Sequence, residues 1–366
     1  MDSQEAANVR SWRRLVELGS GRTGNVTLCV EPAPSPGQAA EKSNVQYQQH
    51  SVVHAVKRVR RKCMSNNGAA RRVLQEKKAL QALKGLHGIV GLRFTSKDDE
   101  NLYFILEPLL GGPLHRHVRA GRSGHLEMTE VIFYASEVTS AIAHMHAQGF
   151  AHRDIKASNI VLDANGHAKV VDLGCSKQLE ARREGRSHGG GDQGVGSGHL
   201  YEKTYTYCGT PHSMAPEMVS REGHGMAVDW WALGILIHEM WNGEPPFGYG
   251  GDGLPGRITA GLPTETANKP VASYDTTSDN KSTQYQSFRP RRRLLDADPK
   301  ARLGSAKDGD EVMSHEWFDS VDWTKTAKLE TTPPAFRKDL GELEFLEEEK
   351  PSHGAAEASV DVFEGF

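Results

Sequence analysis

The sequence is poor in cysteine and contains no long uninterrupted hydrophobic run. The four cysteines include no C-x-x-C pair, which argues against a disulfide framework and a zinc site and is typical of a reducing compartment. The longest apolar stretch, Trp230 to Met240, is interrupted and too short to span a bilayer. We therefore expect a buried helix there and no membrane insertion. Because the N-terminus has no apolar signal region and no Gly at position 2, we expect neither a secretion signal nor myristoylation.

The chain also lacks a strong net charge. Its 44 Lys and Arg residues nearly balance 47 Asp and Glu residues, for a net charge of −3, so we expect no nucleic-acid partner. The 17 histidines are scattered. The pairs His115/His117 and His144/His146 have i,i+2 spacing, which does not share a helix face, and this favours packing or surface roles over metal binding. A length of 366 residues allows two domains or one bilobal unit.

What the sequence does contain is a stretch typical of phosphoryl transfer. Residues 152–159 read H-R-D-x-x-x-x-N, and D-x-G follows at 172–174 after a short alternating segment. In this pattern Asp154 would accept or orient the proton of an incoming hydroxyl group. Lys156 would balance charge on the transferred phosphoryl group.

The same stretch supplies oxygen ligands for a metal. Asn159 and Asp172 would hold Mg²⁺ on the phosphates of ATP, because hard cations prefer oxygen ligands. Arg153, beside the predicted base, is a suitable partner for a phosphate on a nearby loop.

A glycine-rich segment lies near the N-terminus. Residues 19–26 read G-x-G-x-x-G-x-V between two predicted strands, and glycines let backbone approach phosphates closely. The residues after the last glycine are strand-like rather than helical, which favours a flap over ATP phosphates over a dinucleotide-binding unit. An ordinary glycine hairpin is the alternative. The residues predicted to contact ATP here are Leu18, Gly19, Ser20, Gly21, Arg22, Thr23, Gly24, Asn25 and Val26.

A lysine and a glutamate are predicted to pair on consecutive elements. Residues 52–59 alternate as a strand with Lys57 on the same face as Ala55, and a helix over about 68–84 carries Glu76 on its apolar stripe. An inward-facing Lys needs a partner, so the pattern predicts the Lys–Glu pair that holds phosphates. The alternative is that both side chains snorkel, with their charged ends in solvent and no ion pair between them. Residues 31–50 read as a surface insertion.

A break after the predicted strand 102–106 is typical of a hinge between two lobes. Backbone groups of Glu107 and Leu109 are predicted to pair with an adenine edge, and Ala55 and Val161 complete the predicted nucleotide contacts. A helix is predicted over about 128–147.

An activation segment is predicted downstream of the D-x-G motif. Residues 178–203 have a disordered composition, and T-Y-T-Y-C-G-T-P at 204–211 precedes A-P-E at 215–217. Thr206 would be a phosphosite for an upstream kinase, and its phosphate would order the loop through Arg153. Without that phosphate we expect the loop to be mobile.

Several features predict a large helical lobe. Asp229 is predicted to cap the buried helix that follows it, and 294–304 is predicted as a helix, a turn and a second short helix. Arg302 is a candidate partner for Glu217. The arginines at 289–293 indicate a solvated helix start, with a nuclear-import signal as the alternative. Residues 248–287 are expected to be poorly ordered.

In this order, the motifs resemble those of eukaryotic protein kinases over roughly residues 12–366. Within these, the sequence is similar to the AGC group, most of all to the cyclic-AMP-dependent kinase catalytic subunit and next to the cyclic-GMP-dependent kinase. The segments that carry this closer likeness are T-Y-C-G-T-P at 206–211, V-D-W-W-A-L-G at 228–234, K-A-R-L-G at 300–304 and H-E-W-F at 315–318.

The resemblance implies an α+β, bilobal protein kinase fold. It consists of a small antiparallel-sheet lobe with one helix, a large mainly helical lobe and a C-terminal tail that wraps the small lobe. The implied boundaries are a mobile tail at 1–11, a kinase domain at 12–318 with lobes 12–108 and 109–318, and the C-terminal tail at 319–366.

The resemblance also assigns roles to aromatic residues of the tail. Phe345 is similar to the aromatic that closes the adenine pocket, and Phe363 and Phe366 are similar to a terminal hydrophobic motif that docks near the Glu76 helix. Because no cyclic-nucleotide-binding module fits before residue 12, such regulation would come from a separate regulatory subunit.

Two departures from the family concern substrate choice. Pro113 and Ser158 stand where members that select basic substrates carry Glu, whereas the acidic residue Glu239 is retained. We expect weaker selection of Arg before the phosphoacceptor. Leu173 replaces the usual Phe of the D-x-G motif, which should keep the metal ligand.

The resemblance implies an ATP- and Mg²⁺-dependent serine/threonine protein kinase that acts on protein substrates, in the cytoplasm or the nucleus. The alternative is a pseudokinase scaffold that binds ATP or partners without turnover.

Overall fold

The computed structural model describes residues 9–21, 24–32, 52–64, 67–180, 201–262, 289–336 and 366. The chain divides into a small unit, formed by 1–84, 90–110 and 338–366, and a large unit, formed by 85–89 and 111–337. Several expectations lie outside the described residues: the first part of the N-terminal tail, most of the 31–50 insertion, the mobile loop at 181–200, the segment 263–288, and Arg22, Thr23, Phe345 and Phe363. The domain boundaries inferred from the sequence stay predictions.

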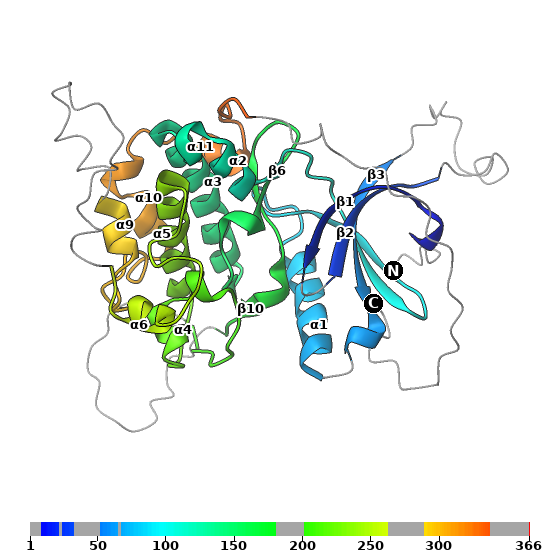
Figure 1. The fold of residues 1–366 in the computed structure, drawn as a ribbon, viewed down its shortest axis with the longest axis horizontal. Helices are drawn as coiled ribbons and strands as arrows, with labels where there is room; N and C mark the ends of the chain where they lie inside the picture. The colour runs from blue at the N-terminus through cyan, green and yellow to red at the C-terminus, as the bar shows by residue number, and fades with distance from the viewer. Residues whose placement is uncertain are drawn as a thin grey trace. The chain divides into compact units, whose positions relative to one another are not determined.

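The small unit contains a five-stranded antiparallel sheet in the order β1-β2-β3-β5-β4 (Figure 1). The strands are β1 (Arg13–Gly21), β2 (Gly24–Val30), β3 (Val53–Arg60), β4 (Leu92–Lys97) and β5 (Asn101–Leu106). A short 3-10 turn, η3 (Arg61–Met64), leads from β3 toward helix α1 (Asn67–Ala82). Every residue of β5 is buried, as expected for a strand inside the sheet with both faces covered.

The two faces of this sheet have different neighbours. Val26, Lys57 and Phe104 stand opposite one another on adjacent strands, and α1 contacts this face through Glu76. Because side chains alternate along a strand, Val56 faces the other side. There it packs in a cluster with Trp12 and the residues Val9, Cys29, Tyr103 and Ile105.

The N-terminal boundary of the ordered chain differs from the prediction. We expected a mobile tail at 1–11, but Val9–Ser11 forms a 3-10 turn, η1. Val9 is buried in the cluster around Trp12, and its apolar burial stabilises the turn. The tail prediction was therefore wrong for 9–11.

The large unit is mainly helical (Figure 1). Its helices are α2 (Leu114–Ala120), α3 (Met128–Ala147), α4 (Pro216–Val219), α5 (Ala227–Asn242), α6 (Leu254–Thr259), α9 (Arg289–Leu294), α10 (Gly309–Met313) and α11 (Trp323–Lys328). Its strands are β6 (Gly112–Pro113), β8 (Ile160–Leu162) and β9 (Ala168–Val170) in one small sheet, and β7 (Phe150–Ala151) paired with β10 (Lys177–Gln178). Short 3-10 turns are η4 (Arg122–Gly124), η5 (Ala157–Asn159), η6 (Leu173–Cys175), η7 (Pro211–Ser213) and η8 (Glu316–Phe318). The predicted α+β class, a sheet unit with a helix and a mainly helical unit, is confirmed.

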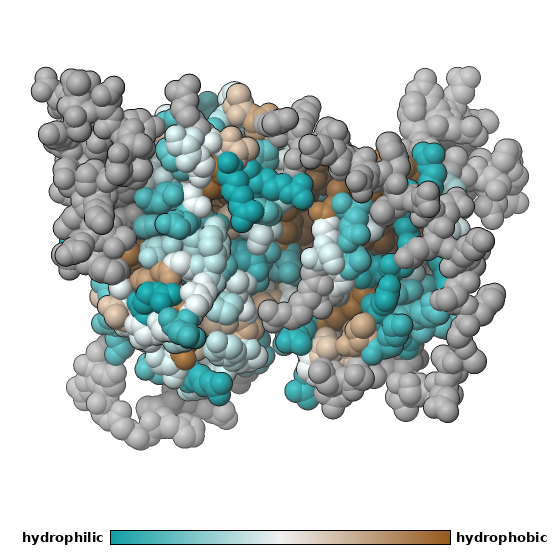
Figure 2. Space-filling model, viewed as in Figure 1, coloured by the Kyte–Doolittle hydropathy of each residue, from teal (hydrophilic) through white to brown (hydrophobic). Residues whose placement is uncertain are grey.

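Helices α3 and α5 form the centre of the large unit. Helix α3 has the bounds expected from its apolar spacing, and Glu127 and Glu130 form a reciprocal capping box at its start. Trp230 and Trp231 of α5 are fully buried. On the face drawn in Figure 2, the described surface of the helical unit is mostly hydrophilic or intermediate, and hydrophobic side chains appear only in small patches. This agrees with the burial of apolar residues such as Trp230 and Trp231 inside the unit.

The segment 248–287 was expected to be poorly ordered, but its described part, 248–262, contains α6, in which Leu254 and Ile258 are buried. That expectation was wrong for these residues.

Two further local predictions in this unit were wrong. Asp229 does not cap α5, because the helix begins at Ala227 and Asp229 lies in its first turn. The expected second short helix within 294–304 is absent, and the chain there runs through turns. Arg302 instead extends inward, where it forms the predicted bridge to Glu217 with N–O distances of 2.7 and 2.9 Å.

Candidate active site

The predicted site residues divide between the two units. In the small unit, strands β1 and β2 form the glycine-rich hairpin, with Ser20 opposite Asn25 and their side chains 3.1 Å apart. Gly24 has φ +150°, and a Cβ there would collide with the carbonyl oxygen of Arg58 on β3. The hairpin therefore requires glycine at this position.

The predicted lysine–glutamate pair is present. Lys57 Nζ lies 2.6 Å from Glu76 Oε1, and both side chains are buried. Removing two charges from water is costly, so each is stable there only with the other as partner. The pair fixes the ammonium group of Lys57 on the face of the sheet that α1 contacts.

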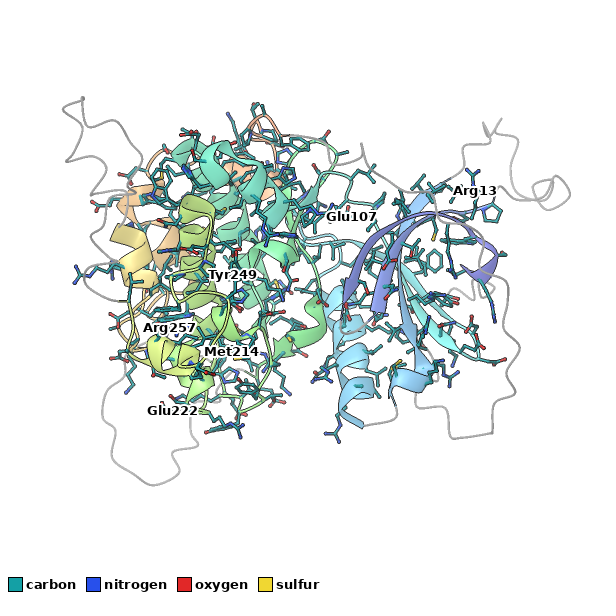
Figure 3. The ribbon with its side chains drawn as sticks, viewed as in Figure 1. Arg13, Glu107, Met214, Glu222, Tyr249 and Arg257 are labelled. Atoms are coloured by element: carbon teal, nitrogen blue, oxygen red, sulfur yellow. The ribbon has the colours of Figure 1, made fainter. Side chains whose placement is uncertain are left out.

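Glu107, at the predicted hinge, is held by two hydrogen bonds with Gly91. Glu107 N donates to Gly91 O at 3.0 Å, and Gly91 N donates to Glu107 Oε1 at 2.8 Å. Figure 3 labels Glu107 at the end of the sheet. Since its N–H is used by Gly91, the predicted adenine contact at Glu107 would have to use the carbonyl group. Leu109 is buried, as is Ala55 on β3.

Phe366 docks on the same unit. Its ring packs edge-to-face on Phe104 at 5.1 Å between centroids, and Lys77 Nζ lies 4.7 Å above the ring. Thr95 Oγ1 donates to Phe366 O at 3.1 Å. Because Lys77 follows Glu76 on α1, Phe366 lies beside the helix that carries the ion-paired glutamate.

In the large unit, the carboxylate of Asp154 is held by three side chains. Lys156 Nζ and Asn159 Nδ2 lie 3.0 and 3.1 Å from Asp154 Oδ2. Thr210 Oγ1 donates to Oδ1 at 2.7 Å. Sequence reasoning missed Thr210 as a partner of the predicted base. The only sequence feature that could have indicated this contact is the position of Thr210 directly before Pro211 in the predicted activation segment.

The two predicted metal ligands lie at one end of the β8–β9 hairpin. Val171 N donates to Asn159 O at 2.9 Å, which brings the residue preceding Asp172 beside Asn159. The side-chain nitrogen of Asn159 donates to Asp154, so its amide oxygen is the atom suited to a cation. Asp172 has φ 58°, a conformation that costs free energy outside glycine and is concentrated at functional sites. An amide oxygen and a carboxylate fit Mg²⁺.

The stretch 152–159, which carries the predicted base, is anchored through its backbone by Asp229. Its Oδ2 accepts from His152 N and its Oδ1 from Arg153 N, both at 2.7 Å, and the residue is fully buried. Arg153 has φ 66°. The carboxylate therefore stabilises a strained turn of backbone next to Asp154, a role that the helix-cap interpretation missed.

His146 on α3 completes this buried charge cluster. Its Nε2 lies 2.9 Å from Asp229 Oδ2 and its Nδ1 lies 2.8 Å from Asp308 Oδ1. Burial lowers the pKa of His146, but the hydrogen bonds and charges of the two carboxylates outweigh burial and raise the pKa to about 9. Burial raises the pKa of Asp229, but His146 brings it below its ordinary value. An imidazolium ion between two carboxylates therefore supports the stretch 152–159.

Arg153 also links the D-x-G region to the activation segment. Its Nε donates to Cys175 O at 2.9 Å, and its Nη1 lies 3.5 Å from Thr206 O. The side chain of Thr206 is exposed, with its hydroxyl 3.2 Å from that of Thr204. The guanidinium group is thus adjacent to the predicted phosphosite before any phosphate is present.

The acidic residue expected to select basic substrates is enclosed. Glu239 is 5% exposed, and it accepts from Tyr249 OH at 3.1 Å and from Ala157 N. Burial raises the pKa of Glu239 against these hydrogen bonds and the charge of Arg119. Arg257 donates to three carbonyl groups of the loop that carries Tyr249, and Figure 3 labels both residues.

The other two positions of this set carry no carboxylate. Ser158 is exposed beside Asn159, and Pro113 on β6 pairs with Val161 on β8. Neither position therefore supplies a carboxylate that could pair with a basic substrate.

A family model described as Protein kinase domain matches residues 12–318. A Caenorhabditis elegans protein named cAMP-dependent protein kinase, catalytic subunit-like is 31% identical over 342 residues, which cover 91% of this chain and 70% of that protein. The Mus musculus cAMP-dependent protein kinase catalytic subunit PRKX is 30% identical, with 93% and 81% covered. The Mus musculus cGMP-dependent protein kinase 2 is 32% identical, with 81% and 34% covered. Among the residues that the structure describes, no helix is both long and apolar enough to cross a membrane.

Proposed function

The chain belongs to the protein kinase family, and we propose that it is an active enzyme that transfers the γ-phosphoryl group of ATP to serine and threonine hydroxyls of proteins. The observation that carries this proposal is the set of contacts around Asp154. Lys156, Asn159 and Thr210 hold its carboxylate in one orientation. A positioned carboxylate beside a cationic side chain suits a reaction in which a hydroxyl attacks a phosphoryl group.

Each side chain then has a distinct task. Asp154 would accept the hydrogen bond of the substrate hydroxyl and take its proton, and Lys156 would face the negative charge of the transferred group. Asn159 and Asp172 would hold Mg²⁺, which supplies neutralisation of phosphate charge when bound. Lys57, held by Glu76 at 2.6 Å, would bind phosphate oxygens of ATP.

Activation would follow phosphorylation of Thr206 by an upstream kinase. The hydroxyl group of Thr206 is exposed, while its backbone carbonyl lies near Arg153 Nη1. A phosphate on this residue would form charge-assisted hydrogen bonds with that guanidinium group. Regulation by a separate chain is a further proposal, supported by the similarity to proteins named as catalytic subunits of the cAMP-dependent protein kinase.

The substrates would be selected only weakly for arginine next to the phosphoacceptor. Ser158 and Pro113 provide no carboxylate, and the carboxylate of Glu239 already accepts hydrogen bonds from Tyr249 and Ala157. A substrate guanidinium group would have to replace those bonds, which removes much of the net gain.

A positional peptide library with Thr206-phosphorylated protein tests activity and selectivity together. We expect phosphoserine and phosphothreonine products and an Arg preference below about tenfold at each position. The variant Ser158→Glu is the matched control, since it restores a carboxylate at an exposed site and should raise the preference for Arg. Strong Arg selection by the unmodified chain would refute the specificity proposal, and nucleotide binding without any phosphorylated peptide would identify a scaffold instead.

A further inference from the structure

A buried histidine lies opposite the activation segment. His224 pairs with Thr204 through two backbone hydrogen bonds, from His224 N to Thr204 O at 3.0 Å and from Thr204 N to His224 O at 2.8 Å. Residues that face each other in such an antiparallel pair have Cα atoms about 5.5 Å apart and extend their side chains to the same side. The imidazole ring of His224 therefore lies on the side to which the hydroxyl group of Thr204 extends.

The hydroxyl group of Thr206 reaches the same side. Thr206 Oγ1 lies 3.2 Å from Thr204 Oγ1, and Arg153 Nη1 lies 3.5 Å from Thr206 O. The charge of Arg153 also acts on His224, and all four residues belong to the large unit. A group attached to Thr206 Oγ1 would therefore have both the guanidinium group and the imidazole ring as neighbours.

The imidazole ring of His224 is buried without a partner. The residue is 3% exposed, and among the residues that the structure describes neither Nδ1 nor Nε2 has a partner in hydrogen-bonding geometry. Burying an unpaired polar group costs free energy, which is why such groups are rare in folded proteins. This cost is removed if an acceptor is brought to the ring after the chain has folded.

The ring is neutral before phosphorylation. Burial lowers the pKa of His224 below its ordinary value of 6.5, and the charge of Arg153 lowers it further. The backbone of Glu222, labelled in Figure 3, and the carboxylates of Glu217 and Asp229 act in the opposite direction but do not outweigh burial. Both carboxylates already have buried ion-pair partners. The imidazole can therefore take up a proton when a further negative charge approaches.

We propose that His224 is a ligand of the phosphate group on Thr206, together with Arg153, and that it becomes an imidazolium ion when this phosphate binds. The inference rests on the proposed phosphorylation of Thr206. A phosphorylated threonine carries a charge of about −1.5 to −2 and three acceptor oxygens, more than one guanidinium group neutralises. A ring N–H of His224 would donate to one of these oxygens in a charge-assisted hydrogen bond, and the added proton would come from solvent.

The contact would make the hold on the activation segment depend on pH. The phosphate raises the pKa of His224 in the folded chain, and the imidazolium form is lost as pH rises through this raised pKa. As pH falls, the phosphate loses charge through its own second pKa of about 6. The phosphate should therefore be held most tightly between these two values.

The test compares the full chain with threonine and with phosphothreonine at position 206, introduced during translation so that no upstream kinase is needed. Histidine ring signals of the ¹⁵N-labelled chain are followed against pH, and the signal that His224→Gln removes is the signal of His224. We expect phosphorylation to shift the titration of His224 to higher pH. His144, whose pKa burial also lowers, is the internal control and should titrate at the same pH in both forms.

The phosphate provides a second readout, by ³¹P NMR and by its rate of removal by a phosphatase. His224→Gln keeps a side-chain donor but cannot become charged, so its phosphate should ionise at higher pH than in the unmodified chain. Because one hydrogen bond to a charged group is lost, a phosphatase should remove the phosphate about tenfold faster. His224→Phe, which keeps a ring without any donor, should show at least the same effect.

A His224 titration that phosphorylation leaves unchanged would overturn the proposal, as would equal phosphate titrations and phosphatase rates in the unmodified chain and His224→Gln. These measurements involve neither ATP nor turnover. An inactive protein with a shifted His224 would refute the proposed kinase activity alone, and an active protein with an unshifted His224 would refute this inference alone.

Discussion

Asp229 Oδ1 accepts a hydrogen bond from Arg153 N at 2.7 Å although 76 positions separate the two residues. The carboxylate belongs to α5 and the N–H to the stretch 152–159, so one buried side chain joins the central helix to the backbone beside Asp154. The arrangement makes the geometry of the predicted base depend on a residue that has no contact with substrate.

Replacing Asp229 with Asn should therefore weaken both the fold and the site. The amide presents a donor to one of two backbone N–H groups and leaves His146 with Asp308 as its one remaining carboxylate partner, which is expected to cost about 3–5 kcal/mol of unfolding free energy. Urea unfolding followed by tryptophan fluorescence measures this loss. Of the 6 tryptophans, only Trp12 lies in the small unit, so the signal reports mainly on the large unit, which contains Asp229.

The matched control for this substitution is Asp310→Asn, at an exposed acidic residue in the first turn of α10. It should change the unfolding free energy by less than about 0.5 kcal/mol. If both variants unfold at the same urea concentration as the unmodified chain, the anchoring role of Asp229 is wrong.

Stability should also depend on pH through His146. Its pKa is raised from an ordinary value near 6.5 to about 9 by Asp229 and Asp308, although burial opposes the change. A raised folded-state pKa contributes stability that is complete below about 6.5 and is lost as pH rises through about 9. The advantage of the unmodified chain over His146→Gln should shrink by about 2–3 kcal/mol between pH 6.5 and 9.5.

Asp308→Asn supplies the control for this pH dependence. It keeps the imidazole and its bond to Asp229 but removes one carboxylate, so the loss of stability should begin at lower pH. If the unfolding free energies of the unmodified chain and of His146→Gln differ by the same amount at every pH, the raised pKa of His146 is contradicted.

The bridge between Glu217 and Arg302 should be strong because it is buried and bidentate. Arg302 is 1% exposed, and its two terminal nitrogens contact both oxygens of Glu217. Arg302→Lys keeps the charge but cannot form both bonds. We expect a loss of about 3 kcal/mol or more in unfolding free energy, since a buried carboxylate is left poorly paired.

An exposed pair in the same unit tests whether burial is the cause. Arg293 and Glu311 are 3.7 Å apart, with the Arg293 side chain 55% exposed, so Arg293→Lys should cost less than about 1 kcal/mol. Equal effects of the two Arg→Lys substitutions on urea unfolding would argue against the distinction.

Periodicity and inward-facing charge made some of these features predictable. The apolar spacing of 128–147 gave the bounds of α3, and the Lys57–Glu76 pair followed from two side chains that each faced an apolar layer. Arg302 and Glu217 were matched as opposite charges on segments typical of the family. In the first two cases the sequence near the residue already carried the physical constraint.

The missed features depend on contacts that no local pattern records. Asp229 stands directly before Trp230 and so fits a helix cap, but its partners are backbone groups at His152 and Arg153. Thr210 reaches Asp154 across 56 positions. In 294–304 the predicted second helix does not form, and Arg302 extends inward to Glu217 instead. The buried bidentate bond stabilises the chain more than helix propensity, which differs between residues by only a few tenths of a kcal/mol.

Phe366 should stabilise the small unit through Phe104 and Lys77. Phe366→Ala removes an aromatic ring that is 9% exposed and the cation–π contact, with an expected cost of about 3 kcal/mol. Amide hydrogen exchange should become faster in β5 and α1 and stay unchanged in α5. Phe366→Leu retains apolar volume and should show a smaller effect; unchanged exchange in β5 for Phe366→Ala would contradict the docking role.

Whether the chain is an active kinase is decided by turnover of the purified, Thr206-phosphorylated protein with Mg-ATP and a serine peptide, measured beside the variant Asp154→Asn. Nucleotide binding to both proteins is measured in parallel, since Asp154 is proposed to act on the hydroxyl and not on ATP. We predict phosphoserine formation by the unmodified chain and a rate about 10²–10⁴-fold lower for the variant, with ATP binding retained. ATP binding by both proteins without turnover by either would contradict the proposed kinase activity and identify a scaffold.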